Sequence, residues 1–284
     1  MIESMHTEPT DEEGGVAWLF CPADRPDRYD KAFASADVVI LDLEDAVASP
    51  GKSAARDSLR AADFDDVRVV VRINAHGTDD HEKDVRLVRE LGLQRVMLAK
   101  AETVTDLELL EGLDVTALIE TPRGLVSVND LATHSGVSRL MWGADDFIAA
   151  LGGTASRNAT GEYKTVVSHL RSSVLVAAKA HGCEALDGVY TSIPDLDGLR
   201  AETADAAACG FDGKVAIHPD QVEVIRREFH PSPERLSWAD AVLKAAGSGG
   251  VALVAGQMVD RPMVLQATRV QRLAQAARSV RRES

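Results

Sequence analysis

The chain has 284 residues, a formal net charge of -14 at pH 7, 45% hydrophobic residues and only 4% aromatic residues. This length and apolar content suffice for one large α/β domain whose core consists mainly of aliphatic side chains. The excess of negative charge would repel a phosphate backbone, and the sequence has no concentrated basic patch. The composition therefore argues against a nucleic-acid partner.

The amino-terminal segment and the cysteines indicate where the protein acts. The first fifteen residues are acidic and polar, without the basic start and apolar stretch of a signal peptide. Apolar runs of eighteen residues are absent, so no membrane partner is expected. Cys21, Cys183 and Cys209 lack metal-ligand spacing and indicate reduced thiols. We expect a disordered acidic segment at residues 1–15 and a cytoplasmic protein.

Short runs rich in β-branched residues alternate with helical patterns along most of the chain. The expected strands are Ala17–Cys21, Asp37–Leu43, Val67–Ile73, Arg95–Ala99, Val115–Ile119, Arg139–Gly143, Glu184–Val189 and Gly213–Ile217. The expected helices between them include Asp79–Leu91, Thr105–Glu111, Tyr163–His181 and Leu196–Cys209. The gaps suit right-handed crossover helices rather than hairpin turns. This repetition predicts an α/β fold, a (β/α)8 TIM barrel over residues 16–230.

A doubly wound open sheet is the alternative fold. Such a sheet usually binds a dinucleotide through a Gly-x-Gly-x-x-Gly turn after its first strand. Here the first strand is followed by Pro22-Ala-Asp-Arg-Pro-Asp-Arg, which cannot wrap a pyrophosphate in that way. A Rossmann dehydrogenase is therefore disfavoured.

The pattern changes after the eighth expected strand. Helices are expected at Gln221–Glu228 and, after a break at Pro231 and Pro233, at Glu234–Ala246. A short strand or turn at Val251–Val254 precedes a terminal helix at Arg261–Arg282, which has apolar and basic faces. We expect residues 231–284 to form a C-terminal helical extension that packs on a neighbouring subunit.

Polar residues lie at the ends of most expected strands. In a parallel barrel the carboxyl ends of all strands open to one mouth, so we expect these side chains to converge there. A single charge at a strand end carries little weight, because strands commonly end in solvent. The residues concerned are Asp42, Glu44, Asp45, Arg72, Asn74, Lys100, Glu120, Asp145, Asp146, Asp187 and His218.

Two of these carboxylates, Glu120 and Asp146, indicate a metal site. Mg2+ prefers oxygen ligands and is commonly held by one or two carboxylates together with water and substrate. Mn2+ would fit the same ligands. Zinc is disfavoured because His218 is the only imidazole at an expected strand end.

Arg72 has two interpretations from its chemistry alone. Its planar guanidinium could grip a substrate carboxylate or a developing oxyanion in a bidentate manner. It could equally form an ion pair with Asp42 or Glu44, because a buried acid needs a cation whatever its function. The two roles can coexist.

Seven segments, in this order, resemble the citrate lyase beta subunit-like (HpcH/HpaI aldolase/citrate lyase) family. The resemblance covers about residues 17–265 and implies a Mg2+-dependent acyl-CoA lyase on a TIM barrel. The segments are Leu19-Phe-Cys-Pro-Ala-Asp-Arg-Pro-Asp-Arg, Ile40-Leu-Asp-Leu-Glu-Asp-Ala-Val, Val71-Arg-Ile-Asn, Leu118-Ile-Glu-Thr-Pro-Arg-Gly, Gly143-Ala-Asp-Asp-Phe, Asp187-Gly-Val-Tyr-Thr and Gly210-Phe-Asp-Gly-Lys-Val-Ala-Ile-His-Pro.

The resemblance assigns roles to residues at matching positions. Glu120 and Asp146 would be the Mg2+ ligands, and the substrate would bind to Arg72, Glu120, Asp145 and Asp146. Acidic residues that hold metal-bound waters would be Asp42, Glu44 and Asp45. The CoA moiety would be received by Arg25, Lys31, His218 and Pro219.

The resemblance also implies two catalytic residues, Arg72 and Asp260. Asp260, in the segment Gly256-Gln-Met-Val-Asp-Arg-Pro-Met, would reach the mouth of a neighbouring subunit and act as acid or base. Without the resemblance, Asp260 reads as a turn residue before Arg261 and Pro262.

The implied reaction cleaves or forms a 3-hydroxyacyl-CoA, such as citryl-, malyl- or citramalyl-CoA. The products would be acetyl- or acyl-CoA and a 2-keto acid such as oxaloacetate, and the enzyme would be a homo-oligomer, either a homotrimer or a hexamer. One alternative is a CoA-independent aldolase that acts on free hydroxy-keto acids. Another is a non-catalytic subunit that binds CoA or a keto acid.

Overall fold

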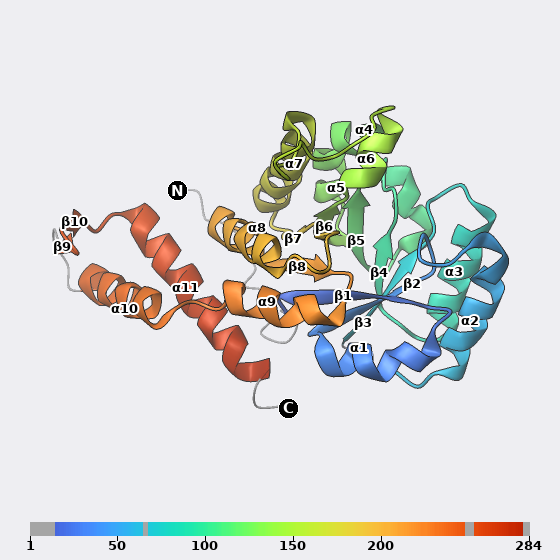
Figure 1. Cartoon of the computed structure of the whole chain (residues 1–284), viewed down its shortest axis with the longest axis horizontal. Coiled ribbons are helices and arrows are strands. Elements are labelled where there is room, and N and C mark those ends of the chain that lie inside the picture. Colours follow the sequence, from blue (N-terminus) through green and yellow to red (C-terminus); the bar gives the residue numbers. More distant parts are fainter. Residues whose placement is uncertain (1–14, 65–67, 248–252, 281–284) are drawn as a thin grey trace.

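The computed structural model describes residues 15–64, 68–247 and 253–280. Its centre is a closed barrel of eight parallel strands in sequential order, in which β8 pairs with β1 (Figure 1). The strands are β1 Ala17–Pro22, β2 Val38–Asp42, β3 Val69–Ile73, β4 Arg95–Leu98, β5 Asp114–Ile119, β6 Val137–Trp142, β7 Glu184–Asp187 and β8 Gly213–Ala216. The predicted TIM barrel is confirmed. The acidic segment expected at residues 1–15 lies outside the described residues except for Gly15.

Helices connect successive strands and surround the barrel (Figure 1). The α-helices are α1 Tyr29–Ser35, α2 Lys52–Ala61, α3 Asp79–Glu90, α4 Pro122–Val126, α5 Val128–Thr133, α6 Ala144–Ala150, α7 Thr165–His181, α8 Leu196–Cys209 and α9 Pro219–Phe229. Short 3-10 helices are η1 Pro26–Arg28, η2 Ser49–Gly51 and η4 Val104–Leu110. The helix expected at Thr105–Glu111 is thus a 3-10 helix, which begins with a capping box between Thr103 and Asp106. None of the helices described is long and apolar enough to span a membrane.

The barrel interior is filled by a small apolar cluster of strand residues. Its buried members are Trp18, Val38, Ile40, Val70, Met97, Leu118, Met141, Leu186 and Val215. Side chains alternate between the two faces of a strand, so a residue two positions after an inward one again faces the interior. Asp42, Arg72 and Glu120 stand two positions after Ile40, Val70 and Leu118. Alternation therefore directs these three charged side chains into the barrel mouth.

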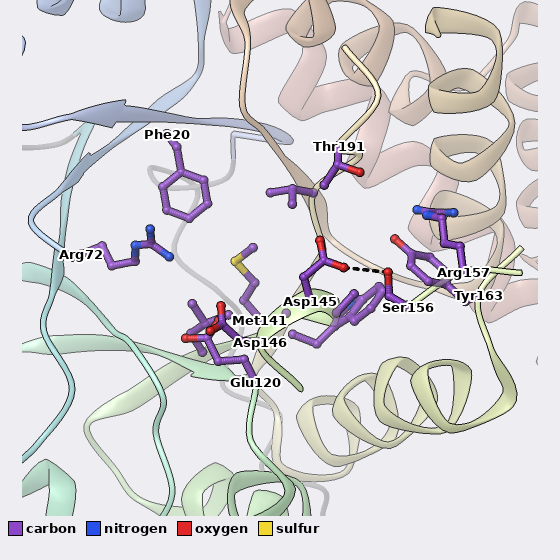
Figure 2. A pocket seen from close by; sticks show the side chains of 15 residues that line it. Phe20, Arg72, Glu120, Met141, Asp145, Asp146, Ser156, Arg157, Tyr163 and Thr191 are labelled. Carbon is purple, nitrogen blue, oxygen red and sulfur yellow. Dashed lines mark hydrogen bonds between the residues drawn. The ribbon is translucent and has the colours of Figure 1, made fainter. Parts of the chain in front are cut away.

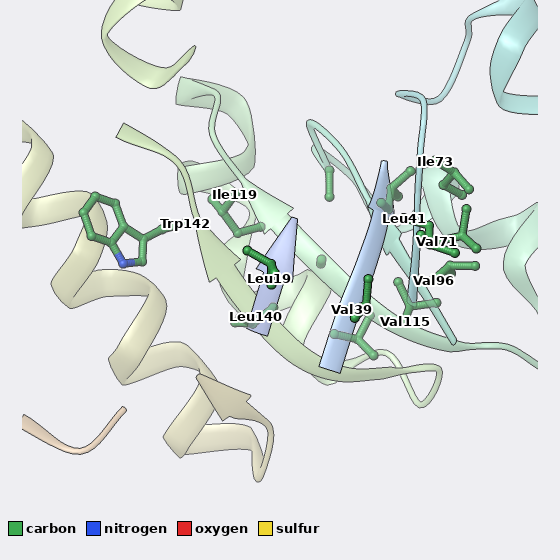
Figure 3. Packing of buried hydrophobic residues seen from close by; sticks show 14 of the residues in the cluster. Leu19, Val39, Leu41, Val71, Ile73, Val96, Val115, Ile119, Leu140 and Trp142 are labelled. Carbon is green, nitrogen blue, oxygen red and sulfur yellow. The ribbon is translucent and has the colours of Figure 1, made fainter. Parts of the chain in front are cut away.

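A larger apolar cluster packs between the strands and the surrounding helices. It contains outward strand residues such as Leu41 and Val71 (Figure 3). Helix residues such as Leu59 and Val174 belong to the same cluster. The low aromatic content explains why Val, Leu, Ile and Ala dominate both faces of the sheet. The core thus fixes the strand ends that carry the polar residues.

The C-terminal part is a separate helical arm beside the barrel. It consists of α10 Pro233–Gly247, a hairpin of β9 Leu253–Val254 and β10 Gln257–Met258, and α11 Arg261–Val280. Ala239, Val242, Ala267 and Val270 form its own buried cluster. Figure 1 shows this C-terminal arm projecting away from the barrel. The predicted helices are confirmed over the described residues, and Leu253–Val254 of the expected strand or turn form β9; residues 251–252 and 281–282 of these predictions lie outside the described residues.

Candidate functional site

A cavity of about 140 Å³ lies at the carboxyl ends of the strands. Its apolar lining includes Phe20, Leu118, Met141 and Val189. Its polar lining includes Arg72, Glu120, Asp145, Asp146, Ser156, Arg157, Tyr163 and Thr191 (Figure 2). Four residues predicted to bind substrate, Arg72, Glu120, Asp145 and Asp146, are therefore brought together in one cavity.

Glu120 follows β5 directly and is almost completely buried, with 3% of its surface exposed. Its Oε1 accepts a hydrogen bond of 3.0 Å from the backbone N–H of Lys100. A Cβ atom at Gly143 would lie 2.7 Å from Oε2, so the glycine makes room for this carboxylate. Burial raises the pKa of Glu120 to about 8; Lys100 opposes the rise and Asp146 adds to it.

Asp146 lies in the first turn of α6, one residue after Asp145. The Nζ atom of Lys100 is 3.9 Å from Glu120 Oε1 and 3.5 Å from Asp146 Oδ1, so the two carboxylates lie close together. Asp145 turns to the other side and accepts a 2.7 Å hydrogen bond from Ser156 Oγ (Figure 2).

The donor atoms of the site fit Mg2+ or Mn2+. Nowhere in the described ranges do three His, Cys, Asp or Glu side chains gather into a complete metal cage. A pair of carboxylates is nevertheless a common protein contribution to a Mg2+ site, because water and substrate oxygens supply the other ligands. Zinc would require His or Cys ligands, and neither type lines the cavity.

Arg72 forms the ion pair that its sequence context allows. Its Nε and Nη2 atoms donate to the two carboxylate oxygens of Asp42 at 2.7 and 2.5 Å, and Nη1 lies 3.4 Å from Glu44 Oε2. The guanidinium also packs over the Phe20 ring, 4.5 Å from its centroid. Because Arg72 still lines the cavity, it can face a bound anion while Asp42 holds it in place.

Lys100 stands among the acids that surround the two candidate ligands. Its ammonium donates a hydrogen bond to Glu44, which is buried, and lies 3.5 Å from Asp45, which is exposed. Burial alone would lower the pKa of Lys100, but the carboxylates of Glu120, Glu44 and Asp146 outweigh it and raise the pKa. The sequence placed this lysine at a strand end without indicating a role.

Asp187 and Asn74 do not join the mouth, so the expectation that every strand-end polar group converges there is wrong. Asp187 follows the inward Leu186 and therefore faces the helices, where it is fully buried. It accepts hydrogen bonds from Trp142, Arg171 and Lys214 at 3.0, 2.8 and 2.7 Å.

Asn74 is held behind the mouth by neighbouring side chains. Its backbone N–H and its Nδ2 both donate to Asp84 Oδ2 of α3, at 3.0 and 2.6 Å. Its Oδ1 accepts a hydrogen bond from the buried ammonium of Lys52. This network supports the turn after β2, because Lys52 also donates to the carbonyl groups of Leu43 and Glu44.

The residues predicted to receive CoA lie outside the cavity lining. Arg25 and Lys31 are exposed near α1, and Arg25 pairs with Asp27 at 2.8 Å. His218 caps α9 by accepting a 3.2 Å hydrogen bond from the Asp220 N–H, and Pro219 begins that helix. Because β1 and β8 are neighbours in the barrel, these two groups follow adjacent strands.

Asp260 lies on the C-terminal arm, just before α11, and is exposed. Its carboxylate accepts a 3.0 Å hydrogen bond from the Met263 N–H. It does not line the cavity of its own barrel, and Figure 1 shows the arm projecting away from that barrel.

The model of the HpcH/HpaI aldolase/citrate lyase family matches residues 17–219. The chain belongs to this family. A citrate lyase subunit beta-like protein from Mycobacterium tuberculosis is 49% identical over 266 residues, which cover 93% of this chain and 97% of the relative. A (3S)-malyl-CoA thioesterase from Cereibacter sphaeroides is 31% identical over 280 residues, 93% of this chain and 95% of the relative.

A crystal structure from the same family shows the same architecture. Protein CitE from Mycobacterium tuberculosis, in complex with magnesium, acetoacetate and coenzyme A, superposes with a TM-score of 0.88 at 49% identity. The match covers 92% of this chain and 98% of that chain. The resemblance found in the sequence is thus confirmed, and this is a family of aldolases and citrate lyases.

One wall of the cavity was not predicted from the sequence. Ser156, Arg157 and Tyr163 come from the segment between α6 and α7. Arg157 lies over the Tyr163 ring at 3.6 Å and donates to Glu202 of α8 at 2.7 Å. Glu202 in turn accepts a 3.0 Å hydrogen bond from the buried Lys214. The partners are far apart in sequence, so no local pattern could have revealed this wall.

Proposed function

We propose that this chain is a Mg2+-dependent carbon–carbon lyase that cleaves or forms a 3-hydroxyacyl-CoA such as citryl-, malyl- or citramalyl-CoA. The products of cleavage are acetyl- or acyl-CoA and a 2-keto acid. The observation that carries the proposal is that Glu120, Asp146 and Arg72 line a single cavity at the barrel mouth. Membership of the aldolase and citrate lyase family supports the reaction type.

Each residue at the mouth has a role in the proposal. Glu120 and Asp146 hold the metal ion, and Asp42, Glu44 and Asp45 form the acidic surroundings that orient its waters. The bound ion supplies positive charge that polarises substrate oxygen atoms. Arg72, fixed by Asp42, stabilises the negative oxygen of the reacting centre, a contribution worth about 3 to 4 kcal/mol for one well-placed donor.

The proposed cleavage begins at the 3-hydroxyl group of the thioester. A base takes the proton of the 3-hydroxyl group, the bond between C2 and C3 breaks, and a keto group forms at C3. The electron pair of that bond becomes the thioester enolate. The carboxylic acid of Asp260 then gives a proton to the enolate carbon, and exchange with water returns the base and Asp260 to their starting protonation states. In the reverse direction the Asp260 carboxylate removes a proton from acetyl-CoA.

A panel of CoA thioesters tests the proposal. The protein is incubated with citryl-, malyl- and citramalyl-CoA, with Mg2+ or with EDTA, and products are identified by mass spectrometry. We expect one thioester to yield acyl-CoA and keto acid in the presence of Mg2+ alone. Release of free CoA as well would add a thioesterase step, the activity named for the Cereibacter relative.

The same panel separates the proposal from its alternatives. Cleavage of free hydroxy-keto acids, without any reaction of the thioesters, would establish the CoA-independent aldolase instead. Binding of CoA or keto acid without turnover of any thioester would establish a non-catalytic subunit. Either result would contradict the proposed lyase.

We further propose a homo-oligomer, a homotrimer or hexamer, in which the C-terminal arm brings Asp260 to a neighbouring mouth. The support is that Asp260 is exposed on an arm that also exposes Leu253, Met258 and Leu265, each more than half exposed. We also propose that CoA contacts Arg25, Lys31 and the His218–Pro219 pair.

Co-expression of two inactive variants tests the shared site. Asp260→Asn and Glu120→Gln each remove one half of the composite site, and neither homo-oligomer should turn over substrate. In random mixed oligomers, about a quarter of the sites combine two intact halves, so we expect activity to return to about that level. Absence of any recovery in purified mixed oligomers would contradict the shared site.

A further inference from the structure

Lys100 has an unusual backbone conformation two residues after β4. Its φ is +50°, and Ala255 is the one other non-glycine residue with positive φ in the described ranges. L-residues adopt this region rarely, and at functional sites such strain is commonly retained for the geometry that it gives. Here that geometry directs both the backbone N–H and the side chain of Lys100 toward the acids of the mouth.

The ammonium of Lys100 lies within 4 Å of four carboxylates. It donates to Glu44 and stands 3.5 Å from Asp45, 3.5 Å from Asp146 and 3.9 Å from Glu120. With its backbone N–H on Glu120 Oε1 as well, Lys100 contacts that carboxylate from two directions. Arg72, another cation close to these carboxylates, is already bound to Asp42 in a bidentate ion pair.

Lys100 does not line the cavity itself. It contacts the carboxylates from outside the cavity lining, where it can influence their charge and orientation without touching a substrate in the cavity. A group in this position acts on a metal through its ligands, as residues behind a metal site commonly do.

We propose that Lys100 is a positioning residue that serves as the internal counter-ion of the metal site. In the absence of the ion, the Lys100 ammonium holds Glu120 and Asp146 together, and it competes with a divalent cation for these carboxylates. Once the ion is bound, the positive charge of Lys100 favours binding of the keto-acid anion. The inference rests on the proposed function, since it takes Glu120 and Asp146 as the ligands of Mg2+.

The proposal predicts opposite effects on two affinities. Replacing the ammonium by a neutral side chain leaves the mouth more negative, so a divalent cation is attracted more strongly and an anion less strongly. A merely structural role of Lys100 would weaken both, because a distorted site binds neither ligand well.

Isothermal titration calorimetry can measure both affinities on the full-length protein. Mg2+ alone is titrated first, and pyruvate is then titrated into the Mg2+-saturated protein. For Lys100→Met we expect the Kd for Mg2+ to fall about tenfold and the Kd for pyruvate to rise about tenfold. Met is neutral, is similar in length to Lys and has the same backbone cost at positive φ.

Two control variants separate local charge from other effects. Lys100→Arg keeps the charge and should leave both Kd values within about threefold of wild type. Lys83→Met removes the same charge from the outer surface of α3, where its side chain is 49% exposed, and should change neither value. Thermal unfolding of each variant verifies that it is folded.

The possible outcomes separate this inference from the proposed function. If folded Lys100→Met binds both Mg2+ and pyruvate more weakly, or if neither Kd changes, the counter-ion role is overturned. If Glu120→Gln binds Mg2+ as wild type does, the proposed metal site fails and the inference falls with it. If Glu120→Gln loses Mg2+ while Lys100→Met shows no opposite shifts, only the inference fails.

Discussion

Glu120 and Asp187 are two buried carboxylates at the ends of parallel strands with opposite properties. Glu120 faces the cavity, where its neighbours within 4 Å include the ammonium and the backbone N–H of Lys100. Asp187 faces the helices and accepts three hydrogen bonds, from Trp142, Arg171 and Lys214. Burial raises the pKa of Glu120 to about 8, whereas Lys214 and Arg171 overcome the same effect and lower the pKa of Asp187.

The difference shows how one fold uses the same residue type for two purposes. A buried acid whose hydrogen bonds are complete stabilises the contact between strands and helices. A buried acid with too few donors is costly, and its cost is recovered when a cation binds. The incomplete partner set of Glu120 is therefore what distinguishes the site from the structural network around Asp187.

The largest expected effect is the loss of activity in Glu120→Gln. Turnover of the preferred thioester should fall on the order of 1,000-fold, because the negative charge of the ligand is lost and one of its two oxygens becomes an NH2 group, which does not bind Mg2+. The free energy of unfolding without Mg2+ should not decrease, because glutamine is neutral in the folded and the unfolded chain and so avoids the cost of the raised pKa of Glu120. Steady-state kinetics and urea denaturation measure the two quantities. A lower unfolding free energy in Glu120→Gln would contradict the distinction between Glu120, which serves the site, and Asp187, which stabilises the fold.

Asp187→Asn should lower the free energy of unfolding by about 3 to 5 kcal/mol, because it leaves Lys214 and Arg171 without their buried anion. Urea denaturation followed by tryptophan fluorescence measures this loss. A matched control is Asp197→Asn on α8, whose side chain is 91% exposed and pairs with Arg200. We expect a loss below about 0.5 kcal/mol there. Equal losses in the two variants would contradict the structural role of Asp187.

The two carboxylates should also respond to pH in opposite directions. Without Mg2+, the raised pKa of Glu120 means that folding favours its protonated form, so stability decreases as pH rises from about 4.3 toward the folded pKa of about 8. The lowered pKa of Asp187 instead gives stability that is complete above about 3.9 and is lost in acid as pH falls through the folded pKa.

Denaturation of wild type and Glu120→Gln between pH 5 and 8 isolates the first effect. The difference in unfolding free energy should shift in favour of the variant by up to about 1.4 kcal/mol per pH unit. Saturating Mg2+ should remove most of this slope. A difference that does not change with pH would show that Glu120 titrates normally.

The smallest expected effect concerns the cavity wall. Ser156→Ala removes the 2.7 Å hydrogen bond to Asp145, a contact worth about 0.5 to 1.5 kcal/mol. We expect kcat/KM to fall severalfold while the unfolding free energy changes little. Ser58→Ala, a change at a partly exposed position on α2, is the matched control and should leave kcat/KM unchanged.

Much of the fold could be predicted because buried parallel strands are marked by continuous β-branched runs. Each of the eight expected strands overlaps an observed one. The same reasoning brought three residues to one mouth: Arg72 lies near the end of β3, Glu120 directly follows β5, and Asp146 lies in the first turn of the helix after β6. These predictions depend on local patterns and on the parallel topology.

The side of the sheet on which the last side chain of each strand lies could not be predicted in the same way. In β7 the residues Ala185, Leu186 and Asp187 show no alternation of polar and apolar types, so the sequence does not say which face Asp187 occupies. Its partner Lys214 is 27 residues away, and Arg157 meets Glu202 across 45 residues. Such pairs become visible only when the barrel closes, and the partner of Asp260 would lie on another chain.

Mg2+ titration of wild type, Glu120→Gln and Asp187→Asn under one set of conditions tests the central distinction most directly. We expect wild type and folded Asp187→Asn to bind the ion with similar affinity, and Glu120→Gln to bind it at least about tenfold more weakly. Equal affinity of wild type and Glu120→Gln would contradict the assignment of the metal site to the incompletely paired carboxylate.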